Sequence, residues 1–287
     1  ADKNGNILWE KNYGGTGDDF PMSIIQTTDN GFLVTGYTHS GDHHFQGNHG
    51  KKDSFVMKLD SQGSVEWSRL YGGFDNEEAG ACVEVEDGYI IAGETNSVDA
   101  DVSKQRNNRS IWLFKLDKEG NILWNKAFQR DEVQCASAMV AAPDGGFLVG
   151  GFTSVKGNNS EDIYLMKTDE HGYFEWERII GGEDRELLFG LTATKDGHFV
   201  LTGTSGSKEL FSKKNLGSWD IWVVELDSTG EIQKAKQIGG SSYEEVLFLG
   251  ATRDDDILIA GLTDSKDGDF ESVDTDKTAA FYFKLNR

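Results

Sequence analysis

Short apolar runs alternate with turn residues along the whole chain, and none has the spacing of an amphipathic helix. The first repeat shows the pattern clearly, because Gly, Asp and Asn separate the stretches GNILWEKNY, DFPMSIIQTTD, GFLVTGYT and DSFVMKLD. Runs of this length, bounded by turn residues, are typical of β-strands. We therefore expect an all-β protein.

A turn of the form Asp-x-x-Gly recurs five times. The copies DKNGNILW, DSQGSVEW, DKEGNILW, DEHGYFEW and DSTGEIQK begin at Asp2, Asp60, Asp117, Asp169 and Asp227, which gives spacings of 58, 57, 52 and 58 residues. Four short strands at a period of about fifty residues favour the blade of a β-propeller. We predict one domain over residues 1–287, a five-bladed β-propeller with four antiparallel strands per blade. Its repeat units are about 2–59, 60–116, 117–168, 169–226 and 227–287.

The order of the strands in each repeat leaves the first predicted strand of the chain without a blade at the N-terminus. If DFPMSIIQTTD is the innermost strand of the first blade, residues 5–13 belong to the outermost strand of another. We predict that they complete the last blade beside residues 281–285 and so close the ring. Closure of this kind removes two exposed sheet edges.

Four recurring elements carry a resemblance to a known repeat. They are KLDxxGxxxW, a Gly-Gly pair followed by acidic residues, DGG[FY]xVxG and GNHG, and they cover essentially the whole chain. The chain resembles the secreted bacterial β-propeller repeats of Bacteroidetes surface proteins (SBBP-like repeats). This resemblance implies an extracellular accessory propeller. Two units depart from the pattern, with Gln129 and Arg130 in place of Gly-Gly and Lys234 in place of the recurring Trp.

Charge and composition narrow the partners. The net charge of −21 and the lack of a basic cluster disfavour nucleic acid and anionic membrane surfaces. No run approaches the roughly 18 apolar residues of a membrane span. We expect a monomer that is secreted or displayed on the cell surface, with its signal segment removed. The two cysteines, Cys82 and Cys135, lie in apolar segments without metal-ligand spacing, which predicts buried free thiols.

An acidic residue follows the Gly-Gly pair at each blade crossover. Four carboxylates stand four positions after the second Gly, and the degenerate unit offers Asp131 or Glu132; the set is Asp19, Glu77, Glu132, Glu186 and Glu244. One interpretation is a ring at the channel mouth that binds a cation or a polar ligand. The other is that each carboxylate caps backbone N–H groups of its own crossover. Repetition in every blade favours the cap.

The histidine-rich stretch GDHHFQGNHG invites a metal hypothesis. When the loops are aligned, this stretch shares a pattern with two others: Asp, any residue, Asp or His, then an apolar anchor. The candidate metal-binding pairs in this pattern are Asp42 and His44, Asp99 and Asp101, and Asp267 and Asp269. Ca²⁺ is the cation these pairs suggest, but it takes six to eight oxygen ligands and the full loop motif is missing. Zinc or nickel held by the histidines is a further alternative, without a recognised spacing. Asp residues in loops more often close turns onto the backbone, so we expect no cofactor.

Aromatic residues of the same loops add a candidate surface. Phe211, Trp219 and Phe270 suit either stacking on a sugar and docking of a protein, or anchoring of their own loops.

The sequence therefore predicts a non-catalytic binding or scaffolding propeller that engages a protein or glycan through its loop-rich face. The alternatives are a glycosidase-like enzyme that uses two channel carboxylates, and a cation-dependent lectin. No GxSxG, HExxH or phosphate-binding loop is present, and propellers host many activities on one scaffold.

Overall fold

The computed structural model describes residues 4–102, 109–129, 133–154, 160–211, 213–252, 254, 256–273 and 277–285. Within these ranges the regular elements are β-strands, apart from one turn of 3-10 helix at Gly268–Phe270. The chain forms two compact units, Ala1–Ser137 and Ala138–Arg287. No helix in the described part is long and apolar enough to cross a membrane.

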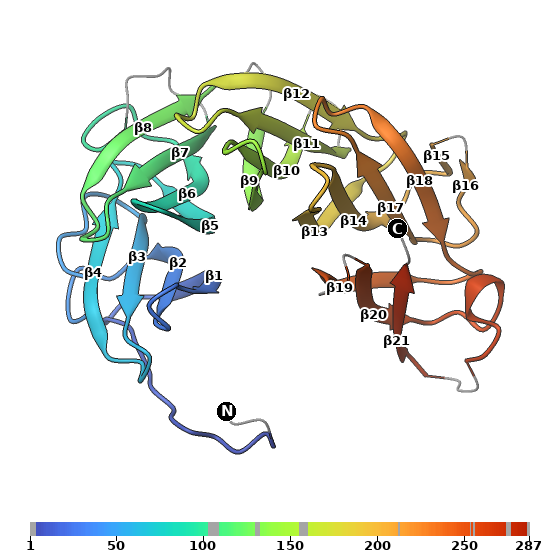
Figure 1. Cartoon of the computed structure of the whole chain (residues 1–287), viewed down its shortest axis with the longest axis horizontal. Coiled ribbons are helices and arrows are strands. Elements are labelled where there is room, and N and C mark those ends of the chain that lie inside the picture. The colour runs from blue at the N-terminus through green and yellow to red at the C-terminus, as the bar shows by residue number, and fades with distance from the viewer. Residues whose placement is uncertain are drawn as a thin grey trace. The chain divides into compact units, whose positions relative to one another are not determined.

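The first unit contains two four-stranded antiparallel sheets (Figure 1). The first sheet pairs β1 (Asp19–Gln26), β2 (Phe32–Thr38), β3 (Asp53–Leu59) and β4 (Val65–Tyr71) in chain order. The second pairs β5 (Glu77–Val85), β6 (Gly88–Thr95), β7 (Ser110–Leu116) and β8 (Ile122–Phe128) in the same way. Side chains of both sheets form one core, in which Val56 and Tyr71 of the first pack with Trp112 and Phe114 of the second.

The other three sheets follow, and all of them except the start of the third lie in the second unit. The third sheet pairs β9 (Val133–Ala141), β10 (Phe147–Ser154), β11 (Glu161–Thr168) and β12 (Phe174–Ile180). The fourth pairs β13 (Glu186–Ala193), β14 (Phe199–Ser205), β17 (Asp220–Leu226) and β18 (Ile232–Ile238), and its loop carries the ribbon β15 (Glu209–Leu210) and β16 (Lys213–Lys214). The fifth sheet has three strands, β19 (Glu244–Ala251), β20 (Ile257–Thr263) and β21 (Ala279–Leu285).

Equivalent strands have equivalent burial and irregularities. Strands β3 and β17, each third in its sheet, are buried along their whole length, whereas the outer strand β4 is half exposed. Continuous burial accounts for their uninterrupted apolar sequences. The innermost strands of four sheets share a register shift at one position, after Pro21, Ala79, Leu188 and Val246. The same irregularity therefore recurs at the equivalent position of these four sheets.

Residues 5–13 differ from the prediction, because they form no strand where the structure describes them. A strand forms when the backbone groups of a neighbouring strand serve as its hydrogen-bond partners, and the described part of the chain places no strand beside this segment. Its side chains nevertheless lie against the first sheet. Trp9 makes an edge contact with Phe32 (5.9 Å between ring centroids), Lys11 Nζ donates to Ser64 Oγ (3.0 Å) and Tyr13 Oη donates to the Gly63 carbonyl (2.6 Å).

The same contacts recur between the outer strand of the first sheet and the second sheet. Trp67 Nε1 donates to the Lys118 carbonyl (3.0 Å), and Tyr71 Oη donates to the Gly120 carbonyl (2.6 Å). Gly120 adopts φ +81°, and a Cβ there would lie 3.0 Å from the Trp67 ring. Residues 5–13 therefore place their side chains as an outer strand does.

Candidate functional site

The crossover carboxylates point inward onto their own backbone. Glu77 is fully buried; its Oε2 accepts the Gly73 N–H (2.8 Å), and its Oε1 accepts the Thr95 hydroxyl (2.7 Å) and the Ser97 N–H (3.2 Å). Asp19, Glu186 and Glu244 repeat the pattern, each accepting the N–H of the second Gly and a hydroxyl of the second strand.

These contacts are those of the capping interpretation. A buried carboxylate that accepts two or three hydrogen bonds from the main chain and a neighbouring hydroxyl has little capacity left for a ligand. Asp131 and Glu132, from the degenerate unit, lie outside the described residues. Ligand binding by Asp19, Glu77, Glu186 and Glu244 remains a prediction without support from their geometry.

The Asp-rich loops bind the same Gly-Gly crossovers from the other side. In each of three sheets, the first Asp of the motif accepts the N–H of the residue after the Gly pair: Asp42 from Thr16 (2.8 Å), Asp99 from Phe74 (3.1 Å) and Asp267 from Ser241 (2.7 Å). The second position faces the first Gly: Asp101 accepts from Gly72 (3.3 Å), Asp269 from Gly239 (3.0 Å), and His44 Nδ1 lies 3.2 Å from Gly14 N.

The middle residue of each motif has a positive φ, at His43 (52°), Ala100 (51°) and Gly268 (62°). This left-handed position closes a turn in which the anchor N–H returns to the first Asp carbonyl, as in Phe45 N to Asp42 O (2.9 Å). The anchors Phe45, Val102 and Phe270 are buried. The motif is therefore a turn that clamps the crossover.

In the described part of the chain, no three His, Cys, Asp or Glu side chains lie close enough together to hold a metal ion. Hydrogen bonds from the Thr16 N–H and hydroxyl lower the pKa of Asp42, as expected for a capping carboxylate. His49 bonds Asp53 through its ring Nδ1 (2.7 Å) and through its backbone N–H (2.9 Å). In the stretch GDHHFQGNHG, Asp42, His44 and His49 thus have partners within the fold.

The expected aromatic surface needs correction. Phe270 is 2% exposed and packs on Phe281 and Phe283, with ring centroids 5.3 and 5.7 Å apart, so it is a core anchor. Phe211 and Trp219 are half-buried, the first against the core of the third and fourth sheets. A loop that must cover apolar strands buries its largest side chains first.

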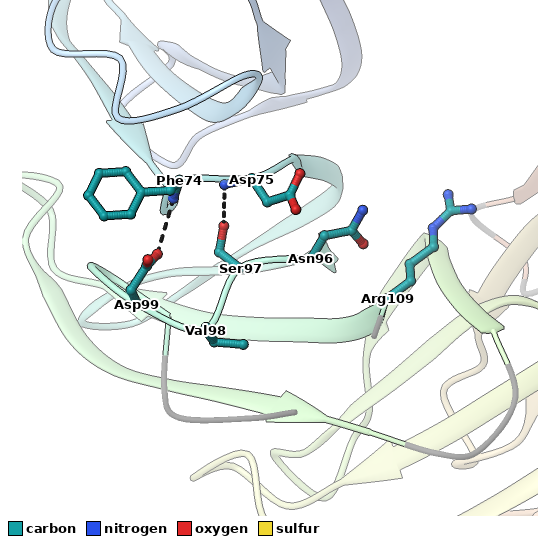
Figure 2. Close-up of a pocket in the computed structure, with 7 residues that line it drawn as sticks. All are labelled: Phe74, Asp75, Asn96, Ser97, Val98, Asp99 and Arg109. Atoms are coloured by element: carbon teal, nitrogen blue, oxygen red, sulfur yellow. Dashed lines mark hydrogen bonds between the residues drawn. The ribbon is translucent and has the colours of Figure 1, made fainter. Parts of the chain in front are cut away.

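A cavity of about 510 Å³ lies instead on the loops of the second sheet (Figure 2). Phe74 and Asp75 come from the crossover between β4 and β5, Asn96 to Asp99 follow β6, and Arg109 precedes β7. The full lining is Phe74, Asp75, Asn96, Ser97, Val98, Asp99 and Arg109.

Hydrogen bonds fix the backbone of this site, whereas the Phe74 side chain is exposed to solvent. Asp99 Oδ1 accepts the Phe74 N–H (3.1 Å), and Ser97 Oγ accepts the Asp75 N–H (2.9 Å), as the dashed lines of Figure 2 show. Phe74 is nevertheless 73% exposed, and Val98 of the same lining is 37% exposed. An exposed phenyl ring on an anchored turn is a preformed apolar contact surface.

Charged and polar groups also line this cavity. Asp75 Oδ1 accepts from Lys51 Nζ (2.9 Å), and Arg109 Nε donates to Glu94 Oε2 (2.7 Å). Burial opposes the charged form of Arg109, but nearby acidic groups, Glu94 foremost, together outweigh it and raise the pKa of the guanidinium. Arg109 is therefore a fixed cation one third exposed at the cavity wall.

Sequence reasoning missed Phe74, Asn96 and Arg109. The residue after the Gly pair is Thr16, Phe74, Glu183 or Ser241 in the four units that keep this pair, so an aromatic occurs there once. That single departure was the available signal. Arg109 lies far from the crossover in sequence, and only the pairing of β6 with β7 brings it near Asn96.

Comparisons with known proteins agree on fold alone. Searches with family models and against curated proteins found no match. Among solved structures, the chain is similar to an N10 neuraminidase-like protein of A/little yellow-shouldered bat/Guatemala/060/2010, with a TM-score of 0.50, 10% identity, and 92% of this chain and 78% of that chain covered. A DUF4221 family member from Bacteroides vulgatus has a TM-score of 0.47 at 9% identity, covering 94% of this chain and 91% of its own.

A mannose phosphorylase from Leishmania mexicana, with a TM-score of 0.43 and 10% identity, covers 89% of this chain and 81% of its own. The likeness to the neuraminidase-like protein and the succession of antiparallel sheets identify the chain as an all-β protein with a propeller-like fold.

Proposed function

We propose that this protein is a non-catalytic binding propeller that holds a glycan in the cavity of the second sheet, with Phe74 as the stacking platform. The observation that carries the proposal is an exposed aromatic ring on an anchored turn, in the lining of a cavity of about 510 Å³ that also contains Asp75, Asn96 and Arg109. Small-ligand sites combine such an apolar surface with a few placed polar groups.

The chemistry of the lining suits a sugar. A pyranose ring has one C–H face that packs on an aromatic ring, and hydroxyl groups that both donate and accept hydrogen bonds. The Asn96 amide offers both functions, the Asp75 carboxylate accepts and the Arg109 guanidinium donates. Val98 extends the apolar part of the wall.

The partners of the two cavity carboxylates favour glycan binding over hydrolysis. A glycosidase needs two carboxylates with separate roles on either side of the bond it cleaves. The cavity has Asp75 and Asp99, but Asp99 caps the Phe74 N–H and Asp75 is paired with Lys51. Both carboxylates thus have structural partners.

The first test is a glycan array, followed by calorimetry with the best glycan. We expect Phe74→Ala to weaken binding at least tenfold and Phe74→Tyr to retain it, because the tyrosine ring keeps the stacking face. Tyr173→Ala, which removes another exposed aromatic ring in a turn of the third sheet, is the matched control and should bind normally. An array without binders, or equal affinity of Phe74→Ala, would refute the proposal.

Repeating the array with Ca²⁺ and with EDTA separates the cation-dependent lectin. A reducing-sugar assay on the bound glycan separates the hydrolase, since product formation would contradict a non-catalytic site. Capture of a protein partner that Phe74→Ala abolishes, without any glycan signal, would favour the scaffold.

We also propose that five blades close into a ring through residues 5–13. The contacts of Trp9, Lys11 and Tyr13 described above support their assignment as an outer strand. The fifth sheet supports it too, because its third strand carries Lys284 paired with Asp256, as Lys58 of the first sheet is paired with Asp29. In the first sheet the Lys58 position pairs across strands with a Trp.

The register of β3 with β4 sets the test. Val56 pairs with Arg69 there, so the same register places Tyr282 opposite Lys11. A Lys11→Cys, Tyr282→Cys variant should form a disulfide within one chain under mild oxidation, while the neighbouring pair Glu10→Cys, Tyr282→Cys should not. Crosslinks between two chains alone would refute closure within the monomer, which light scattering checks separately.

A secreted or surface-displayed location is proposed from the resemblance to the SBBP-like repeats. Protease treatment of intact source cells should degrade the protein. Full protection inside intact cells, with degradation after lysis, would refute this location.

A further inference from the structure

An aromatic cluster lies in the first sheet, at the cross-strand pair that follows the crossover carboxylate. Phe20 of β1 stands opposite Tyr37 of β2, and their rings stack with centroids 4.9 Å apart and an interplanar angle of 25°. His39, which follows β2, makes an edge contact with Tyr37 at 6.2 Å between ring centroids. These three residues form the aromatic cluster.

The equivalent pairs of three other sheets contain no aromatic residue. The registers identify these pairs as Glu78 with Glu94, Leu187 with Thr204, and Glu245 with Leu262. Each pair directly follows the carboxylate that caps its crossover. The pairing of Phe20 with Tyr37 is therefore a departure from the repeat that the shared capping contacts do not require.

The aromatic cluster is fixed to the second sheet but keeps one ring open to solvent. Lys52 Nζ lies 4.4 Å from the centroid of the Tyr37 ring and forms an ion pair with Glu78 of β5. Phe20 is nevertheless 45% exposed, so the part of its ring that does not lie on Tyr37 faces solvent. An exposed phenyl ring on a fixed support is a preformed surface for stacking.

The exposure of Phe20 does not depend on the position of residues 5–13. Tyr37 shares a face of β2 with Leu33, because alternate residues of a strand share a face, and Leu33 belongs to the core between the first and second sheets. Phe20 stacks on Tyr37 and so lies on this face. Trp9 contacts Phe32, which belongs to the face on the other side. The closing segment and Phe20 therefore lie on opposite faces of the first sheet.

A row of contacts joins the aromatic cluster to the cavity of the second sheet. Lys52, which lies over Tyr37, is paired with Glu78. Glu78 stands directly opposite Glu94 in the register of β5 with β6, and Glu94 Oε2 accepts from Arg109 Nε (2.7 Å). Arg109 lines the cavity. Two ion pairs of the first unit thus connect the two surfaces that carry an exposed phenyl ring.

We infer that the bound glycan is an oligosaccharide that spans both surfaces, with one sugar ring on Phe74 in the cavity and another on Phe20. This inference rests on the glycan binding proposed above. The C–H face of a pyranose packs on either phenyl ring, and the ion pairs between the rings offer donors and acceptors to the hydroxyl groups of the intervening sugars. The second contact strengthens binding because it forms within a complex that already exists.

A length series of the best glycan from the array tests the span. Calorimetry with fragments of one to about six sugar rings should show affinity rising at least tenfold once the chain reaches both phenyl rings. Longer fragments should bind no more tightly, since the described surface adds no further platform along this row.

Substitutions of Phe20 locate the second sugar ring. Phe20→Ala and Phe20→Leu should each weaken the longest fragment about tenfold, because both remove the aromatic face, and should leave the shortest fragment unchanged. Phe20→Tyr should keep the affinity of the parent, and Phe74→Ala should weaken every fragment. Phe189→Ala, which removes an exposed phenyl ring of β13 in the second unit, is the matched control and should change no affinity.

The outcomes separate this inference from the proposed function. Binding that needs Phe74, but neither grows with chain length nor falls in Phe20→Ala, would overturn the span alone. An array without binders would overturn both. Equal losses of long-fragment affinity in Phe20→Ala and Phe189→Ala would also overturn the span, since the effect would not be specific to the aromatic cluster.

Discussion

Replacement of the buried Glu77 separates the two interpretations of the crossover carboxylates. Glu77→Gln keeps the size of the side chain but replaces one acceptor oxygen with an amide donor. If the carboxylate exists to cap the crossover, the variant should be less stable. If it exists to bind a ligand, its loss should relieve a buried charge and leave stability unchanged or increased.

The contacts of Glu77 set the size of the effect. Its two oxygens accept three hydrogen bonds, from the Gly73 N–H, the Thr95 hydroxyl and the Ser97 N–H. The Thr95 hydroxyl can reorient, and the Ser97 N–H also lies 3.0 Å from Thr95 Oγ1. The Gly73 N–H is the donor with no second acceptor among its described contacts, and a buried unsatisfied donor costs about 1–3 kcal/mol.

We therefore expect Glu77→Gln to lower the free energy of unfolding by about 2 kcal/mol, and Glu77→Ala, which also leaves a cavity, by about 3–5 kcal/mol. Urea unfolding followed by circular dichroism measures both. Glu119→Gln, an exposed carboxylate of a nearby turn, should change stability by less than about 0.5 kcal/mol. A Glu77→Gln variant as stable as the parent would refute the capping interpretation.

Three further outcomes follow from individual contacts. Ala100→Gly should raise the melting temperature, because φ is +51° there and glycine adopts this conformation without strain; an unchanged or lower value would show that the extra freedom of the unfolded chain outweighs it. The hydrogen bond to Lys58 lowers the pKa of Asp29, so its stabilisation is present above the usual carboxyl pKa of 3.8 and is lost as the pH falls; acid unfolding of Asp29→Asn should depend less on pH below about 4. Burial raises the pKa of Cys82 to about 11 and raises that of Cys135, so neither thiol should react with Ellman's reagent at pH 8 until the protein is unfolded.

The repeating part of the fold could be predicted from the sequence because each repeat contains the same turn motif. In the Asp-x-x-Gly turn at Asp60, the Asp60 Oδ1 accepts hydrogen bonds from the N–H groups of Gln62 and Ser64. Asp117 and Asp227 accept the equivalent two hydrogen bonds in their own turns. Turn residues bounding apolar runs therefore located the strands. Five copies of one local solution made the succession of sheets predictable.

Placement of the candidate site could not be predicted in the same way. Phe74 and Phe270 are both loop aromatic residues in the sequence, yet one is 73% exposed and the other 2%. The difference depends on what lies beneath each loop. Phe270 packs on Phe281 and Phe283 of β21, and folding of the chain brings this strand beneath the loop. Exposure of an aromatic side chain is a property of packing, which periodicity does not report.

Departures from the repeat carry more functional information here than the repeated polar residues do. A residue that recurs in every blade serves what every blade needs, and the capping carboxylates and clamp aspartates bond backbone groups that every crossover exposes. Phe74 and Phe20 occupy repeat positions whose usual residues have a structural task or none. Phe74 lies in the wall of a cavity of about 510 Å³, and the contacts of Lys52 and Glu78 lead from the Phe20 stack towards the same cavity. In the sequence Phe20 is one departure among several, and its role depends on Tyr37, a second departure on another strand that only the pairing of β1 with β2 brings against its ring. Aligning the repeats and asking where the departures lie in space is therefore the step that links this sequence to the cavities of its fold.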